Sequence, residues 1–370
     1  MTSRQLYFVL PVLRGLLAKR SGNEDDPYSR VILGSDLTLI LNAKQSALPP
    51  LQINAWDENA PAETVREKFR AAIDKFIAQH GAAPVRVKVA DAGPFQIEHC
   101  PPSGVKSKIA VVTGAAGAIG AGICRKLLEH GYHVAATDLI RESLDNLVNE
   151  LKPLAPDRII GVQMDVTDKE SVTAGFAEVA NRWGGVDIVV INAGIAMVAP
   201  LMDLDPEAFR KLEKVNVEGT LLTLAEAGRI LSRQNTGGDI ILISTKNVFS
   251  PGAQFGAYSA TKAASHQLAR IASLEYAPFD IRVNMVAPDA VFSDGQRKSG
   301  LWAEVGPSRM KARGLDEKGL EEYYRNRNLL KARVTATHVA NAVLFFATRQ
   351  TPTTGATIPV DGGLPDATPR

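Results

Sequence analysis

The stretch Thr113-Gly114-Ala115-Ala116-Gly117-Ala118-Ile119-Gly120 decides how the rest of this chain is organised. It follows an apolar run, residues 109–112, that is typical of a buried parallel strand. It precedes residues 121–130, which are typical of a helix ending at Gly131. Strand, glycine-rich turn and helix in this order form a phosphate site. Small residues let the backbone approach a pyrophosphate, and the N–H groups of the helix start face the anion.

A carboxylate at the end of the next apolar run strengthens this prediction. Asp138 follows residues 133–137 and lies 18 positions after Gly120. That position suits an acceptor for the hydroxyls of an adenosine ribose. The glycine-rich turn alone would be a weak sign, but together with the strand, the helix and the acid it predicts a dinucleotide site.

Composition bounds the remaining possibilities. The chain has 370 residues, of which 45% are hydrophobic, and Lys+Arg 42 against Asp+Glu 40 gives a net charge of +2. The sequence has no basic face or run of the kind that predicts a nucleic-acid partner. No apolar run reaches the ~18 residues of a membrane span, so no membrane partner is expected. The two cysteines, Cys100 and Cys124, form no disulfide framework and favour a reducing, cytoplasmic location.

Residues 1–105 differ from the rest and are expected to form a small N-terminal α/β unit. Short strands are predicted at residues 30–33, 37–42 and 85–89, and a helix from Pro61 to Gln79. Pro94 and residues 101–104 are interpreted as a linker. The first 23 residues carry basic but no acidic side chains, as a transit peptide does. Pro11 and Gly15 are expected to interrupt an amphipathic helix there, which disfavours that reading.

From residue 106 to residue 370, predicted strands alternate with predicted helices, the longest of them at 168–183, 206–231, 257–275 and 335–348. This pattern predicts an α/β fold with a doubly wound, Rossmann-like parallel sheet covered by helices on both faces. Ligands of such sheets bind beyond the carboxyl ends of the strands. The residues expected at that edge are Asp138, Asp165, Asn192, Thr245 and Pro288.

Tyr258 and Lys262 lie four residues apart on one helix face. Taken alone, such a pair is most often part of a solvated helix surface. A cation held near a phenol also favours the phenolate and lowers its pKa, which lets tyrosine exchange a proton while hydride moves to or from a nicotinamide. The hydroxyl of Thr245, 13 positions earlier at a predicted strand end, favours this second interpretation.

Residues from 106 onward resemble the short-chain dehydrogenase/reductase family. The motifs that carry the resemblance are Thr113 to Gly120, Asn192-Ala193-Gly194, Asn216 to Gly219, Thr245, the Tyr258/Lys262 pair and Val360 to Gly363. The resemblance implies that Tyr258 donates or accepts a proton. It implies that Lys262 lowers the pKa of Tyr258 and binds the nicotinamide ribose, and that Asn216 holds a water that relays protons through Lys262.

The same resemblance implies NAD as the cofactor. Asp138 favours NAD over NADP because a carboxylate would repel a 2′-phosphate. The residues expected to bind the cofactor are Gly114, Gly117, Ala118, Ile119, Gly120, Asp138, Leu139, Asp165, Val166, Asn192, Ala193, Gly194, Tyr258, Lys262, Pro288, Ala290 and Val291.

The chain departs from the family pattern at three positions. Ala118 stands where the family usually has its second glycine, and Asp289 follows Pro288 where a glycine is frequent. Thr245 replaces the catalytic serine; it keeps the hydroxyl, but its methyl group restricts χ1. Ser244 is expected to point away from the site, since neighbouring strand residues face opposite sides.

A narrower resemblance involves residues 246–247, 288–291, 299–302 and 323–331. They look like the dehydrogenase half of the bifunctional rhamnulose-phosphate aldolase/lactaldehyde dehydrogenases, which implies lactaldehyde as the first substrate candidate. Residues 10–15 and 30–33 resemble the tail of the aldolase half, so residues 1–105 would be a shortened remnant. The zinc-binding part is absent from this sequence, so no metal is predicted.

Residues 289–334 are expected to form a substrate lid. Its cations are Arg297, Lys298, Arg309, Lys311, Arg313, Arg325 and Arg327. They are either solvated, or one of them, or Lys246, meets an anionic or polyhydroxy substrate.

The sequence is therefore compatible with three functions. The first is an NAD-dependent dehydrogenase of a small hydroxylated aldehyde or alcohol, and the second is a sugar-alcohol or hydroxy-acid dehydrogenase on the same scaffold. The third is a catalytically weak NAD-binding protein with a regulatory or assembly role. A small-molecule substrate and a homo-oligomer, dimeric or tetrameric, are the expected partners.

Overall fold

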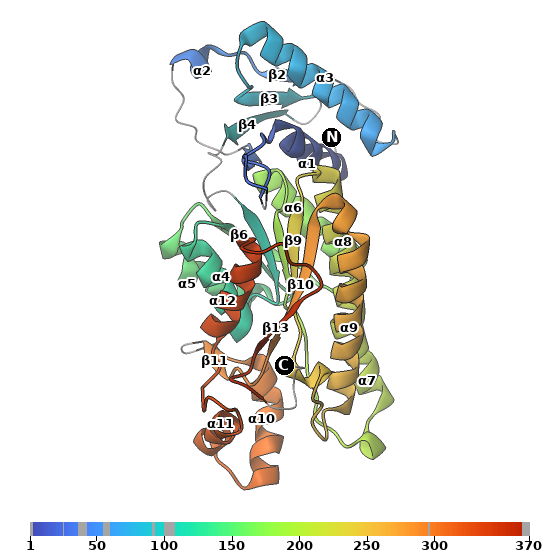
Figure 1. Cartoon of the computed structure of the whole chain (residues 1–370), viewed down its shortest axis with the longest axis vertical. Coiled ribbons are helices and arrows are strands. Elements are labelled where there is room, and N and C mark those ends of the chain that lie inside the picture. The colour runs from blue at the N-terminus through green and yellow to red at the C-terminus, as the bar shows by residue number, and fades with distance from the viewer. Residues whose placement is uncertain are drawn as a thin grey trace.

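The structure is a computed structural model that describes residues 3–24, 26–35, 43–54, 60–90, 93–99, 108–294 and 297–364. Figure 1 shows two sheets stacked along the long axis of the molecule, with a helical segment at the opposite end from the N-terminus. The predicted strand at 37–42, Cys100 and the linker residues 101–104 lie outside the described residues.

The larger sheet has seven parallel strands in the order β13-β10-β9-β8-β5-β6-β7. Its strands are β5 (Ile109–Thr113), β6 (His133–Asp138), β7 (Ile159–Gln163), β8 (Ile188–Ile191), β9 (Gly238–Ile243), β10 (Ile281–Pro288) and β13 (Thr357–Val360). The chain leaves β5 toward β6 and β7 and then returns to β8, on the other side of β5. The strand order therefore reverses beside β5, and ligands bind at such a reversal.

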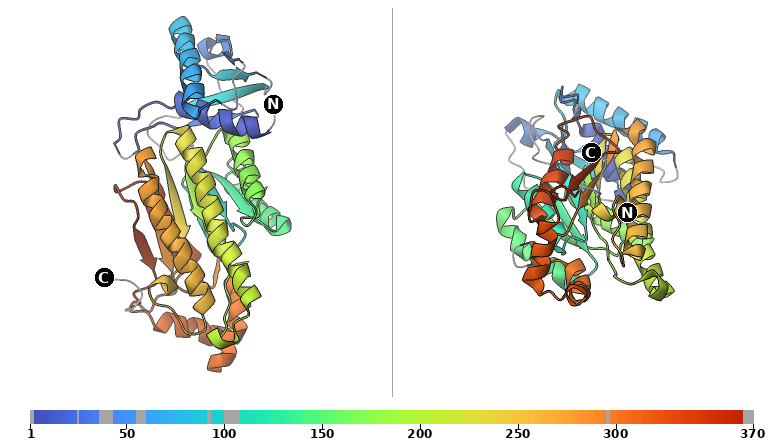
Figure 2. Two further views of the ribbon diagram at one scale, coloured as in Figure 1. Left: turned by 90° about the vertical axis from the view of Figure 1, so that its right-hand side faces the viewer. Right: turned by 60° about the horizontal axis from the view of Figure 1, so that its bottom comes forward.

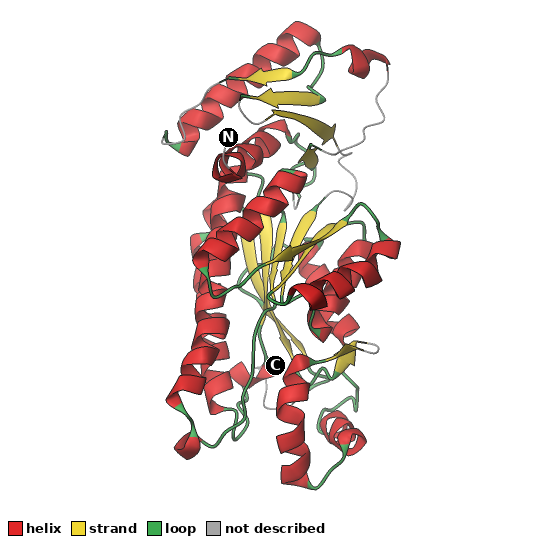
Figure 3. Cartoon of the chain, turned by 180° about the vertical axis from the view of Figure 1, so that it is seen from behind, coloured by secondary structure: helices red, strands yellow, loops and turns green. Residues whose placement is uncertain are grey.

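Helices cover both faces of this sheet, as its buried strands require (Figures 1 and 3). One face carries α4 (Ala118–Glu129), α5 (Arg141–Leu151) and α12 (Ala336–Ala347). The other carries α6 (Lys169–Trp183), α8 (Gly219–Gln234) and α9 (Gly256–Glu275). The predicted doubly wound α/β fold is confirmed. Among the described residues no helix is long and apolar enough to cross a bilayer.

The predicted helix over residues 206–231 consists of three pieces. These are α7 (Pro206–Glu213), a π-helical turn (Lys214–Glu218) and α8. The turn inserts an extra residue per turn and so changes which side chains face the sheet. It places Asn216, which is almost fully buried, against the main body of the protein.

The smaller sheet has the order β1-β4-β3-β2, with β1 (Val31–Gly34), β2 (Leu51–Ile53), β3 (Arg86–Val89) and β4 (Gly93–His99). Two helices of this part of the chain are α2 (Ala43–Ala47) and α3 (Ala62–His80). Pro94, interpreted from the sequence as part of a linker, lies inside β4 opposite Lys88. Among the described residues β1 pairs only with residues 96–99, so no described strand lies beside Pro94 on that side, which is compatible with a proline.

The sequence interpretation was also wrong for the N-terminus, where α1 (Ser3–Leu17) is a continuous helix through Pro11 and Gly15. Proline cannot donate the helical hydrogen bond to the carbonyl of Tyr7. Arg233 of α8 donates to that carbonyl instead, with Nη1 3.4 Å from the oxygen. Gly15 is needed because a Cβ there would lie 1.8 Å from the carbonyl oxygen of Gln234. Tertiary packing therefore supports a helix that its own sequence disfavours.

This N-terminal helix joins the two sheets, packing on α6 and α8 (Figure 2). Arg14 makes a buried bidentate ion pair with Asp187, at 2.7 and 3.0 Å, just before β8 begins. Lys108, just before β5, pairs with Asp26 at 2.8 Å. Residues 3–34 therefore attach to the amino ends of the parallel strands.

The segment after β10 forms the opposite end of the molecule (Figure 1). Its elements are β11 (Ser293–Asp294), β12 (Arg297–Lys298), α10 (Gly300–Arg313) and α11 (Glu317–Asn326). Three aromatic side chains join it together, because Trp302 of α10 stacks on Phe292 at 4.4 Å and meets the ring of Tyr324 at 4.8 Å. This segment, residues 289–334, is called the lid below.

Candidate active site

The glycine-rich turn between β5 and α4 is shaped by close backbone contacts. Gly114 has a φ of +61°, and a Cβ there would lie 2.8 Å from the Cα of Ala193. A Cβ on Gly120 would lie 2.4 Å from the carbonyl oxygen of Gly114. Gly117 meets only one atom, at 3.5 Å, so its backbone is open to an approaching group. These are the properties expected of a turn that holds a phosphate.

The first turn of α4 supplies donors for such an anion. Gly117 is its N-cap and offers no side-chain acceptor. Within the described part of the chain, the N–H groups of Ala118 and Ile119 have no hydrogen-bond partner. Ala118, which departs from the family glycine, is buried and leaves the turn intact. Helix geometry alone therefore gives this turn free donors and a partial positive charge.

Two carboxylates end neighbouring strands beside this turn. Asp138 accepts a hydrogen bond from the backbone N–H of Ala116 at 2.9 Å, which fixes the carboxylate against the glycine-rich turn. Asp165 follows β7 and accepts from the N–H and the hydroxyl of Thr167, both at 2.8 Å. The predicted meeting of these side chains at one sheet edge is what the structure shows.

Asn192 holds the turn to the next strand. Its side-chain amide donates to the carbonyls of Thr113 and Gly114, at 3.0 and 2.9 Å. The Thr113 hydroxyl accepts from the N–H groups of Asn192 and Ala193, both at 3.0 Å. This bracing positions residues 192–194 along the cavity.

Asn216 lies behind Gly194 rather than in the cavity itself. Its side chain accepts from the N–H of Ile195 at 2.9 Å and donates to Ile195 O and to the Thr261 hydroxyl, at 2.9 and 3.0 Å. A Cβ on Gly194 would lie 3.1 Å from both Asn216 Oδ1 and Lys262 Nζ. The asparagine therefore stands next to the lysine, and its role in a water relay stays a prediction.

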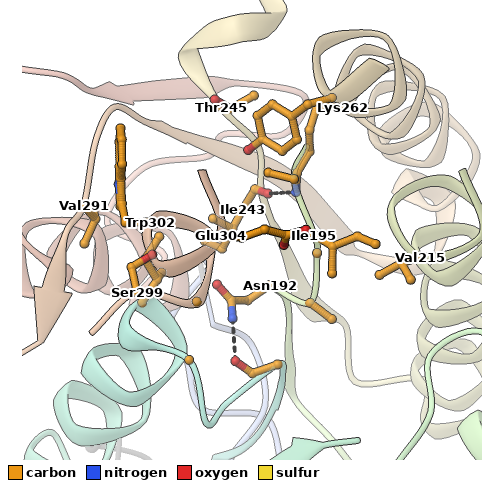
Figure 4. A pocket seen from close by; sticks show the side chains of 18 of the residues that line it. Asn192, Ile195, Val215, Ile243, Thr245, Lys262, Val291, Ser299, Trp302 and Glu304 are labelled. Carbon is orange, nitrogen blue, oxygen red and sulfur yellow. Dashed lines mark hydrogen bonds between the residues drawn. The ribbon is translucent and has the colours of Figure 1, made fainter. Parts of the chain in front are cut away.

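Tyr258, Lys262 and Thr245 come together at the carboxyl end of β9, as predicted, and all three are buried. Lys262 Nζ donates to the carbonyl of Ile243 at 3.1 Å (Figure 4). The hydroxyl of Ser244 lies 2.9 Å from His266 Nδ1, further along α9. Ser244 nevertheless lines the cavity together with Thr245, so its predicted orientation away from the site stays a prediction.

The electrostatics of the pair differ from expectation. Burial raises the pKa of Tyr258 to about 12, and nearby Asp289 adds to this, while a hydrogen bond from Thr245 opposes it. The predicted lowering by Lys262 is absent, because burial lowers the pKa of Lys262 itself to about 8 and its ammonium is bound to a carbonyl. Removing both groups from water penalises each charged form more than their proximity helps.

One cavity of about 980 Å³ unites these elements. Every predicted site residue lines it except Gly120 and Asn216. No described residue before Gly114 lines it, so the smaller sheet is remote from the cavity. Val291, Ser299, Trp302 and Glu304 of the lid face Asn192, Ile195 and Thr245 across it (Figure 4).

Sequence reasoning missed part of this lining. Five further residues line the cavity but belong to no sequence motif that could have identified them. They are Phe255 in the loop before α9 and Glu207, Arg210, Lys211 and Lys214 around α7. In the sequence, Trp302 and Tyr324 belong only to stretches that carry a resemblance, although in the structure they form the aromatic wall of the lid. Only folding brings these distant segments to the site.

The lid cations are distributed unequally. Arg297 donates to the carbonyl of Ala116 at 2.9 Å and pairs with Glu150, and Lys298 pairs with Glu317. Arg313 lies over the ring of Tyr323, and Arg325 pairs with Glu322. Of the lid cations, Arg309 and Arg327 line the cavity, as does Lys246 beside Thr245.

The fold and the site together define a dinucleotide-binding oxidoreductase. The short chain dehydrogenase family matches residues 108–304, just over half of the chain. The L-2,3-butanediol dehydrogenase of Corynebacterium glutamicum is 31% identical over 262 residues, which cover 70% of this chain and 98% of that protein. Sorbitol-6-phosphate 2-dehydrogenase from Erwinia amylovora is 29% identical in sequence, with a TM-score of 0.64 over 69% of this chain and 98% of that one.

This chain belongs to the short-chain dehydrogenase/reductase family and is an enzyme of that family. A longer relative, the uncharacterized oxidoreductase YuxG of Bacillus subtilis, is 34% identical over 306 residues. That match covers 82% of this chain but only 44% of YuxG, so the chain spans less than half the length of that relative.

Proposed function

We propose that this enzyme is an NAD-dependent dehydrogenase that oxidises an alcohol group of a small hydroxylated compound, with Tyr258 as the proton acceptor. The observation that carries the proposal is the convergence of Thr245, Tyr258 and Lys262 in the cavity that begins at the glycine-rich turn. Lactaldehyde, reacting as its hydrate, is the first candidate substrate. A sugar alcohol or a hydroxy acid is the second.

The residues of the turn fit a dinucleotide. Gly117 leaves open space, the first turn of α4 offers free N–H donors, and Asp138 ends the neighbouring strand. When bound, oxidised NAD supplies the acceptor for the hydride and a positive charge in the cavity. Lys262 would bind the nicotinamide ribose, and Asn192 to Gly194 would border the cofactor.

The chain's own side chains handle the proton. Thr245 would orient the substrate hydroxyl, and the Tyr258 oxygen would take the proton of that hydroxyl. The hydride that leaves the same carbon would be taken up by bound oxidised NAD. Because burial holds the pKa of Tyr258 near 12, the free enzyme keeps the phenol protonated at neutral pH. Positive charge from Lys262 and from the cofactor favours the phenolate when both are close.

The test is a panel of small diols, sugar alcohols, hydroxy acids and hydroxyaldehydes, followed by the absorbance of reduced NAD. Turnover with at least one group of compounds supports the proposal. Cofactor binding without turnover of any compound would instead support the alternative function, a catalytically weak NAD-binding protein. The presence of buried Tyr258, Lys262 and Asn216 argues against that alternative.

Asp138 should set the choice between NAD and NADP. Replacing it with alanine removes the carboxylate that would repel a 2′-phosphate and accept the ribose hydroxyls. We expect Asp138→Ala to raise the KM for NAD about tenfold and to lower the ratio of NAD to NADP specificity by at least that factor. Asp145→Ala, at an exposed aspartate of α5 outside the cavity lining, is the control and should leave both values unchanged. Tighter binding of NADP than NAD by the unmodified enzyme would contradict the proposal.

We also propose that the enzyme assembles as a dimer or tetramer through the outer surface of α8 and α9, which lie side by side in Figures 1 and 2. Leu221, Ile271 and Leu274 are exposed there, with 76% of Leu274 accessible. We expect Leu274→Glu to reduce the mass measured by light scattering to that of a smaller species. Leu330→Glu, at an equally exposed leucine of the lid, should leave the mass unchanged. A monomeric unmodified protein would disprove this assembly.

A further inference from the structure

Three cations of the cavity come from three separate segments. Lys246 begins the short 3-10 turn that follows Thr245, Arg309 lies in α10, and Arg327 follows α11. Burial and the positive charges of Arg327 and Arg309 lower the pKa of Lys246, and the carboxylate of Asp289 opposes them. Folding thus gathers like charges at one side of the cavity, although their mutual repulsion opposes it.

Only one of the three charges is neutralised by an acid. Arg327 holds both oxygens of Asp289 at 2.5 Å and stacks on the ring of Tyr324. Lys246 donates to a neutral acceptor, the Ser250 carbonyl, at 2.9 Å. Glu304 also lines the cavity but is exposed, and within the described residues it pairs with none of these cations. Lys246 and Arg309 therefore make no ion pair with a described carboxylate, and Asp289, which is already bound to Arg327, is the acid that acts on Lys246.

Arg309 is the most informative of the three. Only 8% of it is accessible to solvent, and its Nε is buried without a hydrogen-bond partner. Among the described residues its guanidinium has no carboxylate or carbonyl acceptor; it lies 4.7 Å above the ring of Phe255. A buried guanidinium nitrogen without an acceptor is costly, so an arginine held in this way at a cavity wall is suited to an anion from outside the chain.

The cluster lies near the reacting groups. Lys246 follows Thr245 directly in the sequence. The guanidinium of Arg309 lies over the ring of Phe255, and that ring in turn contacts the ring of Tyr258, with centroids 6.1 Å apart. Arg309 is thus one aromatic ring away from the tyrosine. An anion bound there would belong to the same short molecule whose alcohol faces Tyr258.

We propose that Lys246, Arg309 and Arg327 form an anion-binding subsite that selects hydroxylated substrates carrying a carboxylate or a phosphate group. The inference rests on the proposed function and narrows its substrate class from small hydroxylated compounds to negatively charged ones. It favours hydroxy acids and sugar phosphates over neutral lactaldehyde. Arg309 and Lys246 supply charge that is in no ion pair with a described carboxylate, and Asp289 fixes Arg327 at the edge of the subsite.

The first experiment compares matched substrates. Glycerol 3-phosphate is compared with glycerol, and 3-hydroxybutyrate with butane-1,3-diol, at saturating NAD. We expect kcat/KM to be at least tenfold higher for the charged member of at least one pair, and the pair that shows it distinguishes phosphate from carboxylate. Arg309→Met should abolish this advantage through KM, with kcat/KM for the neutral member within about twofold. Arg313→Met, on the same helix but outside the cavity, is the control and should change neither value.

The second experiment measures binding without turnover. The NAD-saturated protein is titrated calorimetrically with inorganic phosphate and with acetate, before and after the Arg309→Met change. Binding that the change weakens at least tenfold supports the subsite even if no compound is oxidised, in which case the proposed function fails alone. Three outcomes would overturn the inference. They are no binding of either anion, an equal loss of kcat/KM for charged and neutral substrates in Arg309→Met, and a raised KM for NAD in that variant.

Discussion

Replacing Tyr258 with phenylalanine is expected to lower kcat by a factor of about 10²–10⁴, the usual contribution of a general acid or base. The substitution removes one oxygen from a buried ring and leaves its packing against Phe255 in place. Substrate and NAD binding should change little, because the phenol oxygen serves proton transfer. The measurement is steady-state oxidation by the unmodified and altered enzymes, with NAD affinity followed by protein fluorescence.

The matched control is Tyr276→Phe at the end of the same helix. That hydroxyl donates to the carbonyl of Leu224 at 3.2 Å, far from the cavity lining, so its loss should cost about 1 kcal/mol of stability and no activity. If Tyr258→Phe retained full kcat, redox chemistry through this tyrosine would be excluded, whatever the cofactor affinity.

The second large effect concerns the buried ion pair between Arg14 and Asp187. Burial by itself would raise the pKa of the Asp187 carboxyl, but Arg14, Arg30 and the backbone N–H of Ile109 hold it well below its ordinary value. We expect Arg14→Met to lower the free energy of unfolding by about 3 kcal/mol or more, because it leaves a buried carboxylate with one fewer partner. Urea unfolding followed by circular dichroism measures the change.

The control for this prediction is Arg141→Met. Its partner is Asp145, and both side chains are exposed on α5, so no measurable loss of stability is expected. KM for NAD should remain unchanged in Arg14→Met, since the cavity lies at the other ends of the strands. Equal stability of the two variants would show that the N-terminal helix contributes nothing through its charge.

Much of the larger sheet could be predicted because its signals are local. Residues 109–120 specify a strand, a turn and a helix through apolar runs and small residues. The structure extends the predicted strand by one residue, to Thr113, and begins the helix three residues earlier than predicted, at Ala118. Asp168 and Thr335 were expected where helices begin, and each caps its helix through its own side chain. The roles of the site residues in catalysis stay predictions, although nearly all of them share one cavity.

The narrower resemblance to lactaldehyde dehydrogenases and the origin of residues 1–105 also stay predictions. The family match begins at residue 108, after that segment. The helix at the start of this segment could not be predicted from neighbouring residues. A proline within a helical pattern predicts a break unless the distant residue that replaces the lost hydrogen bond is known.

The sequence by itself determined the parallel α/β fold, the glycine-rich turn and the pairing of Tyr258 with Lys262, because each depends on residues close together along the chain. Tertiary structure alone decided the rest. It completed α1 through Arg233 and Gly15, raised the pKa of Tyr258 by burial, and brought Lys246, Arg309 and Arg327 to one cavity. The physical reason is that burial and charge depend on neighbours in space, which no short stretch of sequence specifies.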